Sequence, residues 1–479
     1  MNKNIFYCIL AVFFTAAVFS CKGPEGKEGP AGPTGPQGPA GTAGIAGIAG
    51  KDGSVVTIGA DGFWYIDGKK TAYRVDGSHS IPREGMVVVA KFFDRIVADS
   101  MQKRVNIAKQ LGANQLLVFP NQVTNYPGVA EILDGSGIDL WLIAPFFYND
   151  DNRSTAQIAD FGREPNWAIC DDGELAWEVN SPNTHPSGSW LRVVCPNDQA
   201  YIDYRIESLK PALRACNFTG LSLDFMRHFV YWEGTYSYTN PSSLRNACFC
   251  EDCVDKFVDI YGHTSAKPSN MSSEYRITNS AANNNLLDRF VALVDARALL
   301  IAGDVAGSNE AAIKAKTVEI ANFVKANLFR QWTHFKCATI DNNVEYILAK
   351  VREEFPNLKS NIHAVPFTSN SFNGAIRSIA GQDFKLLANR LDQISPMTYD
   401  RLCVRPAYWI NEITTDVVNV VASKVPVVPT IEGRGNEDSD YEASLINALK
   451  YPSSGVVIWR FESLTPERIA ITDRILNNK

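Results

Sequence analysis

The sequence has little surplus charge, and it has no apolar run long enough to cross a membrane comfortably. Its 46 Lys and Arg residues nearly balance 52 Asp and Glu residues, which leaves a formal net charge of −6 over 479 residues. Nucleic acid is therefore not expected as a partner, because such partners are held by a strongly cationic surface. Apolar residues make up 45% and aromatic residues 11% of the chain, enough for a large core in two or more domains.

The N-terminus carries a targeting pattern. Lys3 precedes an apolar run over residues 5–19, which is shorter than the roughly 20 residues of a membrane-spanning helix. Residues 1–21 resemble a bacterial lipoprotein signal peptide in which Cys21 is the lipidated residue, and a secretory signal is the alternative. The resemblance implies an anchor in the outer membrane or at the cell surface, where disulfides can persist.

Two short segments follow the signal. Residues 22–53 hold glycine at every third position from Gly23 to Gly53, and this period resembles a collagen-like stalk. It implies either a homotrimer or a flexible tether. Residues 54–80 contain two clusters of β-forming residues separated by Gly and Asp-Gly turns, which predict a hairpin. They resemble the β modules that follow stalks in exported lipoproteins of the Bacteroidetes, and we assign them a spacer role.

Residues 81–479 alternate apolar, strand-like runs with helical patterns. Such alternation predicts an α/β fold with a parallel sheet, and eight strands in order predict a (β/α)8 TIM barrel. Long insertions follow the third and fourth strands, and the second, at about 229–357, is too long to be one loop and must carry helices of its own. The expected strands are residues 86–93, 116–120, 138–145, 220–225, 360–367, 393–400, 425–432 and 455–460.

Carboxylates stand at the ends of several predicted strands. A barrel presents catalytic groups at the carboxyl ends of its strands, and glycoside hydrolysis needs two carboxylates, one donating a proton and one acting as base or nucleophile. Asp224 is the first candidate, unless it only pairs with Arg227. Glu432 is the preferred partner, and Asp400 is the rival, which could instead cap a helix or form an ion pair.

Other polar and aromatic residues near these strand ends are candidates for substrate binding. Trp459 could be the floor for a sugar ring or part of the core, and His363 is expected to line the barrel. The sequence thus predicts a glycoside hydrolase that needs no cofactor for catalysis and cleaves an extracellular oligo- or polysaccharide. A catalytically inactive glycan-binding lipoprotein is the alternative. The substrate-binding candidates are Asn121, Arg227, His363, Tyr399, Trp459 and Arg460.

Several of these motifs carry a family likeness. The Cys195-Pro-Asn motif, a tyrosine-rich helix, residues 220–227 and the cysteine-rich residues 248–253 together resemble a group of glycoside-hydrolase-like barrels over residues 86–479. Residues 397–400 and Trp459 are also similar to motifs of chitinase-type barrels. However, Met226 stands where those enzymes have the glutamate proton donor, so chitinase-like substrate-assisted hydrolysis is not expected.

Three cysteines lie within six residues, at Cys248, Cys250 and Cys253. This spacing is similar to the zinc-binding cluster of certain barrel β-galactosidases, which implies a structural zinc site. Zinc takes four ligands, and Cys216 is the nearest further cysteine in the sequence. Disulfides or unpaired thiols are the alternatives, and Cys195 could form a disulfide with Cys170 across the insertion after the third strand.

Overall fold

A computed structural model describes residues 54–59, 63–74, 85–93, 98–149, 160–176, 192–232, 244–262, 275–277, 279–435 and 437–477. The predicted signal peptide with Cys21 and the Gly-X-Y segment lie outside these residues. Within the described parts of the chain, no helix is both long and apolar enough to cross a membrane.

The predicted spacer is a small antiparallel sheet. Its strands are β1 (Val56–Ile58), β2 (Phe63–Ile66) and β3 (Lys69–Arg74), paired in that order. Asp67 and Gly68 join β2 to β3 with φ values of 50° and 76°. Positive φ at both central residues is the signature of the two-residue turn that matches the twist of a hairpin, which is why Asp-Gly is favoured there. The predicted hairpin is confirmed.

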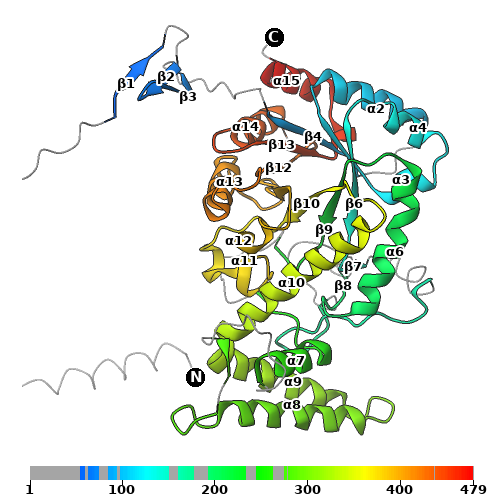
Figure 1. Cartoon of the computed structure of the whole chain (residues 1–479), viewed down its shortest axis with the longest axis vertical. Coiled ribbons are helices and arrows are strands. Elements are labelled where there is room, and N and C mark those ends of the chain that lie inside the picture. The colour runs from blue at the N-terminus through cyan, green and yellow to red at the C-terminus, as the bar shows by residue number, and fades with distance from the viewer. Residues whose placement is uncertain are drawn as a thin grey trace, which may run out of the picture. The chain divides into compact units, whose positions relative to one another are not determined.

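The remainder of the chain forms the predicted barrel, in which eight parallel strands pair in chain order (Figure 1). The ring closes between β11 and the segment before β12, where Ile394 N donates to Pro426 O at 3.0 Å and Val428 N donates to Ile394 O at 2.9 Å. The fold class is therefore confirmed. The strands are β4 (Val87–Lys91), β5 (Gln115–Val118), β6 (Asp139–Pro145), β9 (Gly220–Asp224), β10 (Lys359–Ala364), β11 (Gln393–Pro396), β12 (Thr430–Glu432) and β13 (Gly455–Trp459).

Helices on the outside of the ring bury the outward faces of the strands (Figure 1). They follow from amphipathic sequence patterns that place apolar residues toward the sheet. These helices are α2 (Ala98–Gln110), α3 (Pro120–Thr124), α4 (Val129–Asp134), α6 (Gln199–Ala215), α10 (Phe329–Arg352), α11 (Ala375–Ser378), α12 (Phe384–Leu387), α13 (Tyr408–Val421), α14 (Asp438–Ala448) and α15 (Pro466–Asn477).

The interior of the barrel is filled on one side by apolar and on the other by polar side chains. Alternate residues along each strand point inward. The apolar group consists of Val89, Leu117, Trp141, Ile143, Val428 and Val457. Gly220 makes room for it, because a Cβ there would lie 2.4 Å from the Trp141 ring. The barrel is thus a packed core, and chemistry is left to its rim.

The long insertion after β9 carries structure, as its length predicts. It contains α7 (Glu251–Phe257), a π-helical turn η5 (Val258–Gly262), α8 (Leu286–Ala302), α9 (Glu310–Phe323) and a second π-helical turn η7 (Val324–Leu328). Figure 1 shows α7, α8 and α9 gathered at one end, with α10 running from them towards the strands. The shorter insertion after β6 contains the antiparallel pair β7 (Tyr148–Asn149) and β8 (Arg192–Val193).

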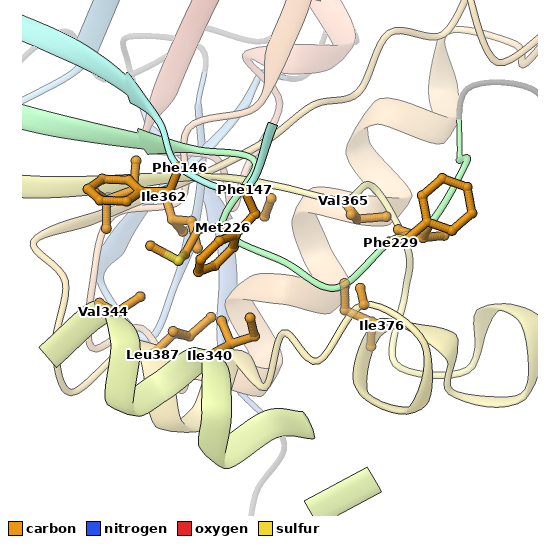
Figure 2. Close-up of a cluster of buried hydrophobic side chains, with 14 of the residues drawn as sticks. Phe146, Phe147, Met226, Phe229, Ile340, Val344, Ile362, Val365, Ile376 and Leu387 are labelled. Carbon is orange, nitrogen blue, oxygen red and sulfur yellow. The ribbon is translucent and has the colours of Figure 1, made fainter. Parts of the chain in front are cut away.

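Helix α10 joins this insertion to the barrel through its buried face. Near its start, Trp332 stacks on Phe249 of the insertion with ring centroids 4.9 Å apart. Further along, Ile340 and Val344 lie among core residues behind β9 and β10 (Figure 2). Met226 belongs to this same core and is fully buried there. The position that holds the chitinase proton donor is therefore part of the apolar packing here.

Candidate active site

Four side chains of chemical interest stand at the carboxyl ends of the strands. Lys91, Asp224, Glu432 and Trp459 are the last residues of β4, β9, β12 and β13. Glu432 pairs in register with Trp459, and Trp459 pairs with Lys91, so these three stand side by side along the rim. Lys91 in turn reaches Asp224 across the interior. This end of a (β/α)8 barrel is where such folds hold their active sites.

Asp224 is a buried carboxylate held among cations. It is 7% exposed, and its Oδ2 lies 3.7 Å from Lys91 Nζ. Phe225 N donates to its Oδ1 at 2.8 Å. Burial alone would raise the pKa of Asp224, but the charges of Lys91 and Arg227 and the backbone hydrogen bond outweigh it, so the pKa is lowered. Asp224 is therefore ionised.

A hydrogen-bonded chain supports this carboxylate from inside the barrel. His363 Nε2 lies 3.0 Å from Ser222 Oγ, and Asn361 Nδ2 donates to the same hydroxyl at 2.8 Å. Burial lowers the pKa of His363 to about 3, so its imidazole is neutral, and the cations that act on Asp224 are Lys91 and Arg227. His363 lies fully buried below the mouth, which is the lining position expected from the sequence.

The surroundings of Glu432 shift its pKa in the opposite direction to that of Asp224. It is 5% exposed, with Arg401 Nη2 at 3.5 Å and Arg434 Nε at 3.9 Å from its Oε1. Its Oε2 is buried without a hydrogen-bond partner among the described residues. Burial raises the pKa of Glu432 despite the two guanidiniums, and the nearby Asp400 carboxylate adds to the rise. Glu432 is thus the carboxyl group of this mouth that favours holding a proton.

Asp400, the rival candidate, is tied to an outer helix. Ser444 Oγ of α14 donates to Asp400 Oδ2 at 2.7 Å, and Arg405 N donates to its main-chain carbonyl at 2.7 Å. Burial raises its pKa, with the Ser444 hydrogen bond opposing this shift. The side chain therefore fixes the loop after β11 against α14, through a contact that is neither the helix cap nor the ion pair considered from the sequence.

Aromatic rings line the mouth beside Glu432. Trp459 is half-buried and stacks on Tyr399, with centroids 4.5 Å apart and planes inclined by 27°. Phe93 meets Trp459 edge-on at 5.4 Å, and Trp232 lies 5.7 Å from Tyr399 on its other side. The Arg460 guanidinium stands 4.2 Å from the Phe93 ring centroid. Trp459 is thus packed against other side chains and partly exposed, and its contact with a sugar stays a prediction.

Asn121, another predicted substrate-binding residue, forms no hydrogen bond with the residues described at the barrel mouth. It lies half-buried in the first turn of α3 and makes no side-chain hydrogen bond among the described residues. Its neighbour Gln122 is buried instead and accepts a hydrogen bond from Phe119 N at 2.8 Å, which caps the helix.

Sequence reasoning missed Lys91, Phe93 and Trp232. Lys91 had a usable signal, because it is the one charged residue at an inward position of the apolar strand Val87–Lys91. The two aromatic residues follow strands without a pattern that distinguishes them from core residues.

A second cluster of reactive groups lies in the insertions. The sulfur atoms of Cys195, Cys248, Cys250 and Cys253 all lie within 4.8 Å of one another, and all four residues are buried. Cys216 is not among them: it packs in the core formed by α2, α4 and the strands next to them. Cys195, distant in sequence, is therefore the fourth thiol in place of the predicted Cys216.

These thiols fit a tetrahedral metal ion better than disulfides. Cys248 and Cys250 have sulfur atoms 3.0 Å apart, and Cys195 lies 3.3 Å from Cys250 and 3.4 Å from Cys253. A disulfide requires about 2.05 Å, whereas four thiolates around zinc stand about 3.8 Å apart, given Zn–S bonds of about 2.3 Å. All described cysteines are free, Cys170 included, so the proposed Cys170–Cys195 bridge is absent.

Asn197 directs two N–H donors at the cluster, one from its backbone and one from its side chain. Asn197 N donates to Cys195 Sγ at 3.3 Å, and Asn197 Nδ2 donates to Cys253 Sγ at 3.1 Å. Although burial disfavours a thiolate, hydrogen bonds from the neighbouring thiols hold the pKa of Cys248 well below its usual range. Four buried sulfur atoms within 4.8 Å of one another, with N–H groups directed at two of them, have the arrangement of a closed structural zinc site.

Comparison with known proteins agrees with the barrel. No protein-family model matches the sequence, and no curated protein matches it. Among solved structures, the chain is similar to the glycoside hydrolase domain of PgaB (BpsB) from Bordetella bronchiseptica, with a TM-score of 0.50 and 9% identity over 81% of this chain and 98% of that domain. The residues described here therefore form a glycoside-hydrolase-like (β/α)8 barrel, a likeness of fold at low identity.

Two β-galactosidases are more distant neighbours. The enzyme of the Antarctic haloarchaeon Halorubrum lacusprofundi has a TM-score of 0.47 and 11% identity over 82% of this chain and 58% of that chain. The enzyme of the psychrophilic Marinomonas ef1 has a TM-score of 0.45 and 10% identity over 82% of this chain and 59% of that chain. This chain spans less than two thirds of either enzyme.

Proposed function

We propose that the barrel mouth hydrolyses glycosidic bonds in an extracellular oligo- or polysaccharide, with Glu432 as general acid and Asp224 as base or nucleophile. The observation that carries the proposal is that two buried carboxyl groups end strands β9 and β12 at the same end of the barrel, one beside Lys91 and the other with a buried oxygen that lacks a hydrogen-bond partner among the described residues. These surroundings lower the pKa of Asp224 and raise that of Glu432. Two carboxyl groups whose surroundings separate their pKa values are the usual basis of an acid–base pair in glycosidases.

The residues would divide the reaction as follows. Glu432 gives its proton to the glycosidic oxygen as the bond to the leaving sugar breaks. Asp224, kept ionised by Lys91, either activates water or attacks the sugar carbon directly. The half-exposed Trp459 offers an aromatic edge to the sugar ring beside Glu432. No metal or organic cofactor is required by this chemistry.

A glycan-binding function without hydrolysis is the second candidate. It is favoured by the ion pairs themselves, because Asp224 lies against Lys91 and Glu432 against Arg401 and Arg434. A carboxylate that is paired with cations serves binding or stability more readily than proton transfer.

One screen separates the two candidates. The protein is incubated with aryl glycosides and with plant and host polysaccharides, and released reducing sugar is measured. Hydrolysis predicts release by the wild type and loss of release by Asp224→Asn, with an unchanged melting temperature for this near-isosteric variant. Glycan binding without release from any substrate would favour the binding function.

The four-thiol cluster is proposed to hold structural zinc. Cys195, Cys248, Cys250 and Cys253 would supply the ligands, and the metal would fix the two insertions to each other by joining residues on either side of β9. Its place in the insertions and its closed set of four protein ligands assign it to stability and not to catalysis.

The location and assembly of the protein are proposed from the sequence alone. Residues 1–21 would direct export, Cys21 would carry the lipid that attaches the protein to the outer membrane or cell surface, and residues 22–53 would form a stalk. Residues 54–80 would act as a spacer before the barrel at 81–479. A homotrimer would follow if the Gly-X-Y segments of three chains wind together.

A further inference from the structure

The two charged side chains that contact Glu432 are cationic and partly exposed, whereas Glu432 itself is buried. The side chains of Arg401 and Arg434 are 40% and 46% exposed, and the side chain of Glu432 is 3% exposed. Both guanidiniums lie within 4 Å of one oxygen atom of Glu432. A ligand that approaches this part of the rim therefore meets two guanidiniums before it meets the acid.

One carboxylate cannot satisfy both arginines. Arg401 uses a single donor, Nη2, in its 3.5 Å contact with Glu432, and a guanidinium has five N–H donors. The Arg434 contact is longer still, at 3.9 Å. Even when Glu432 is ionised, two positive charges around it leave an excess of one positive charge, and a protonated Glu432 leaves two. A second anion would complete the arrangement with charge-assisted hydrogen bonds.

The cations are also fixed next to an aromatic surface. The Arg434 guanidinium lies 6.0 Å from the Trp459 ring centroid, and the Arg460 guanidinium lies 5.0 Å from it. Arg401 runs close to the main chain at Gly435, because a Cβ added to that glycine would lie 3.3 Å from the Arg401 Cδ atom. A ring that stacks a sugar and adjacent guanidiniums that bind an anion are complementary to one kind of molecule, a sugar ring bearing an acidic group.

We propose that the mouth takes an anionic saccharide, one that carries a carboxylate or a sulfate group, and that Arg401 and Arg434 bind that group. This names the substrate class of the same site, and so it rests on the proposed function in placing a glycan at the mouth. The anion on the sugar adds the second negative charge between the two guanidiniums while its ring lies against the aromatic surface of Trp459.

Calorimetric binding tests the proposal with matched ligands. A uronic-acid polysaccharide is compared with its carboxyl-reduced form, and a sulfated polysaccharide with its desulfated form, so that each arm changes only the charge. We expect one anionic form to bind about tenfold more tightly than its neutral counterpart, which corresponds to about 1.4 kcal/mol for hydrogen bonds between the charged groups. The arm that responds identifies carboxylate or sulfate as the group recognised. Added salt should weaken this binding.

Two variants locate the effect. The double variant Arg401→Gln and Arg434→Gln should lose the preference for the anionic form. Arg474→Gln should keep it, because Arg474 lies in the last turn of α15 and pairs with Glu442 of α14, not with Glu432. Equal binding of charged and neutral forms, no binding of either anionic form at low salt, or an unchanged preference in the double variant would overturn the proposal.

The same measurements keep this inference separate from the proposed hydrolysis. Binding of an anionic glycan without cleavage would defeat the hydrolase and leave the inference standing. Cleavage of neutral glycans, with no preference for charged ones, would support the hydrolase and contradict the inference of an anionic ligand.

Discussion

At the scale of single residues, the function depends on what surrounds each carboxyl group. Asp224 and Glu432 are both nearly buried at strand ends, yet their pKa values move in opposite directions. The difference is that Asp224 has Lys91 and a backbone N–H group directed at it, whereas one oxygen of Glu432 has no donor among the residues that the structure describes. Charge alone does not decide the shift, since both carboxyl groups have two cationic neighbours.

The pH dependence of hydrolysis follows from these directions. Turnover needs Asp224 ionised and Glu432 protonated. The pKa of Asp224 lies below its ordinary value, and the pKa of Glu432 lies above its own. The active protonation state therefore predominates at pH values between these two pKa values. Rates should fall as pH rises through the pKa of Glu432 and as pH drops through that of Asp224. The pH profile of kcat/KM checks this, and a rate that only increases toward alkaline pH would exclude these roles.

Lys91 sets the acidic side of that profile as a positioning residue. In Lys91→Met the carboxylate of Asp224 loses its nearest cation, so its pKa should rise and the acidic limb should move to higher pH, while the alkaline limb stays in place. Lys109→Met, an exposed change on α2, is the control and should move neither limb. A uniform loss of rate with an unmoved acidic limb would show that Lys91 serves only packing.

At the scale of elements, the thiol cluster ties segments that are far apart in the sequence. Cys195 lies just before α6, while the other three cysteines lie before and within α7. The sequence could predict the three neighbours from their spacing. It could not predict Cys195, because the nearest cysteine along the chain, Cys216, is placed by α6 in a different core. Proximity of this kind is a property of the fold.

Replacing single cysteines distinguishes the two candidates for the fourth ligand. Cys195→Ser should lower the bound zinc measured by mass spectrometry from about one equivalent to near zero and lower the melting temperature, because a structural zinc site contributes directly to folding. Cys216→Ser should retain the zinc. If Cys195→Ser retained zinc and Cys216→Ser lost it, Cys216 would be the fourth ligand. If the wild type bound no zinc, the proposal of a zinc site would be wrong.

A buried lysine near the thiol cluster should strengthen metal binding. Lys336 is fully buried, donates to Asn246 Oδ1 at 2.6 Å and forms no ion pair among the described residues. Four thiolates around a divalent ion leave a charge of −2, which a nearby ammonium stabilises. Lys336→Met should therefore weaken metal binding by about tenfold, measured by competition with a chelator. Lys350→Met, on the exposed face of α10, should leave it unchanged.

At the scale of the whole molecule, the barrel was predictable because its strands are short apolar runs between helical patterns. All eight lie within the predicted runs or within a residue or two of them, since both faces of a barrel strand are buried and the signal is continuous. The mouth was less predictable. The Lys91–Asp224 and Arg401–Glu432 contacts join different strands or loops, and only closure of the ring brings them together.

The N-terminal segments give a prediction at this scale. The soluble chain from residue 22 onward should form a trimer by light scattering at low temperature if the Gly-X-Y segment winds into a triple helix, and a chain from residue 54 onward should be monomeric. Equal masses for the two chains would assign the segment to a flexible tether. In cells, Cys21→Ser should move the protein out of the membrane fraction.

The most direct test of the central claim compares leaving groups in Glu432→Gln and Asp400→Asn. If Glu432 is the general acid, its replacement should slow hydrolysis of a sugar with a poor leaving group by about 10²–10⁴-fold and that of a dinitrophenyl glycoside far less, since the latter needs little proton donation. Asp400→Asn should stay within a few-fold of the wild type on both. A large leaving-group dependence at Asp400, with none at Glu432, would contradict this account.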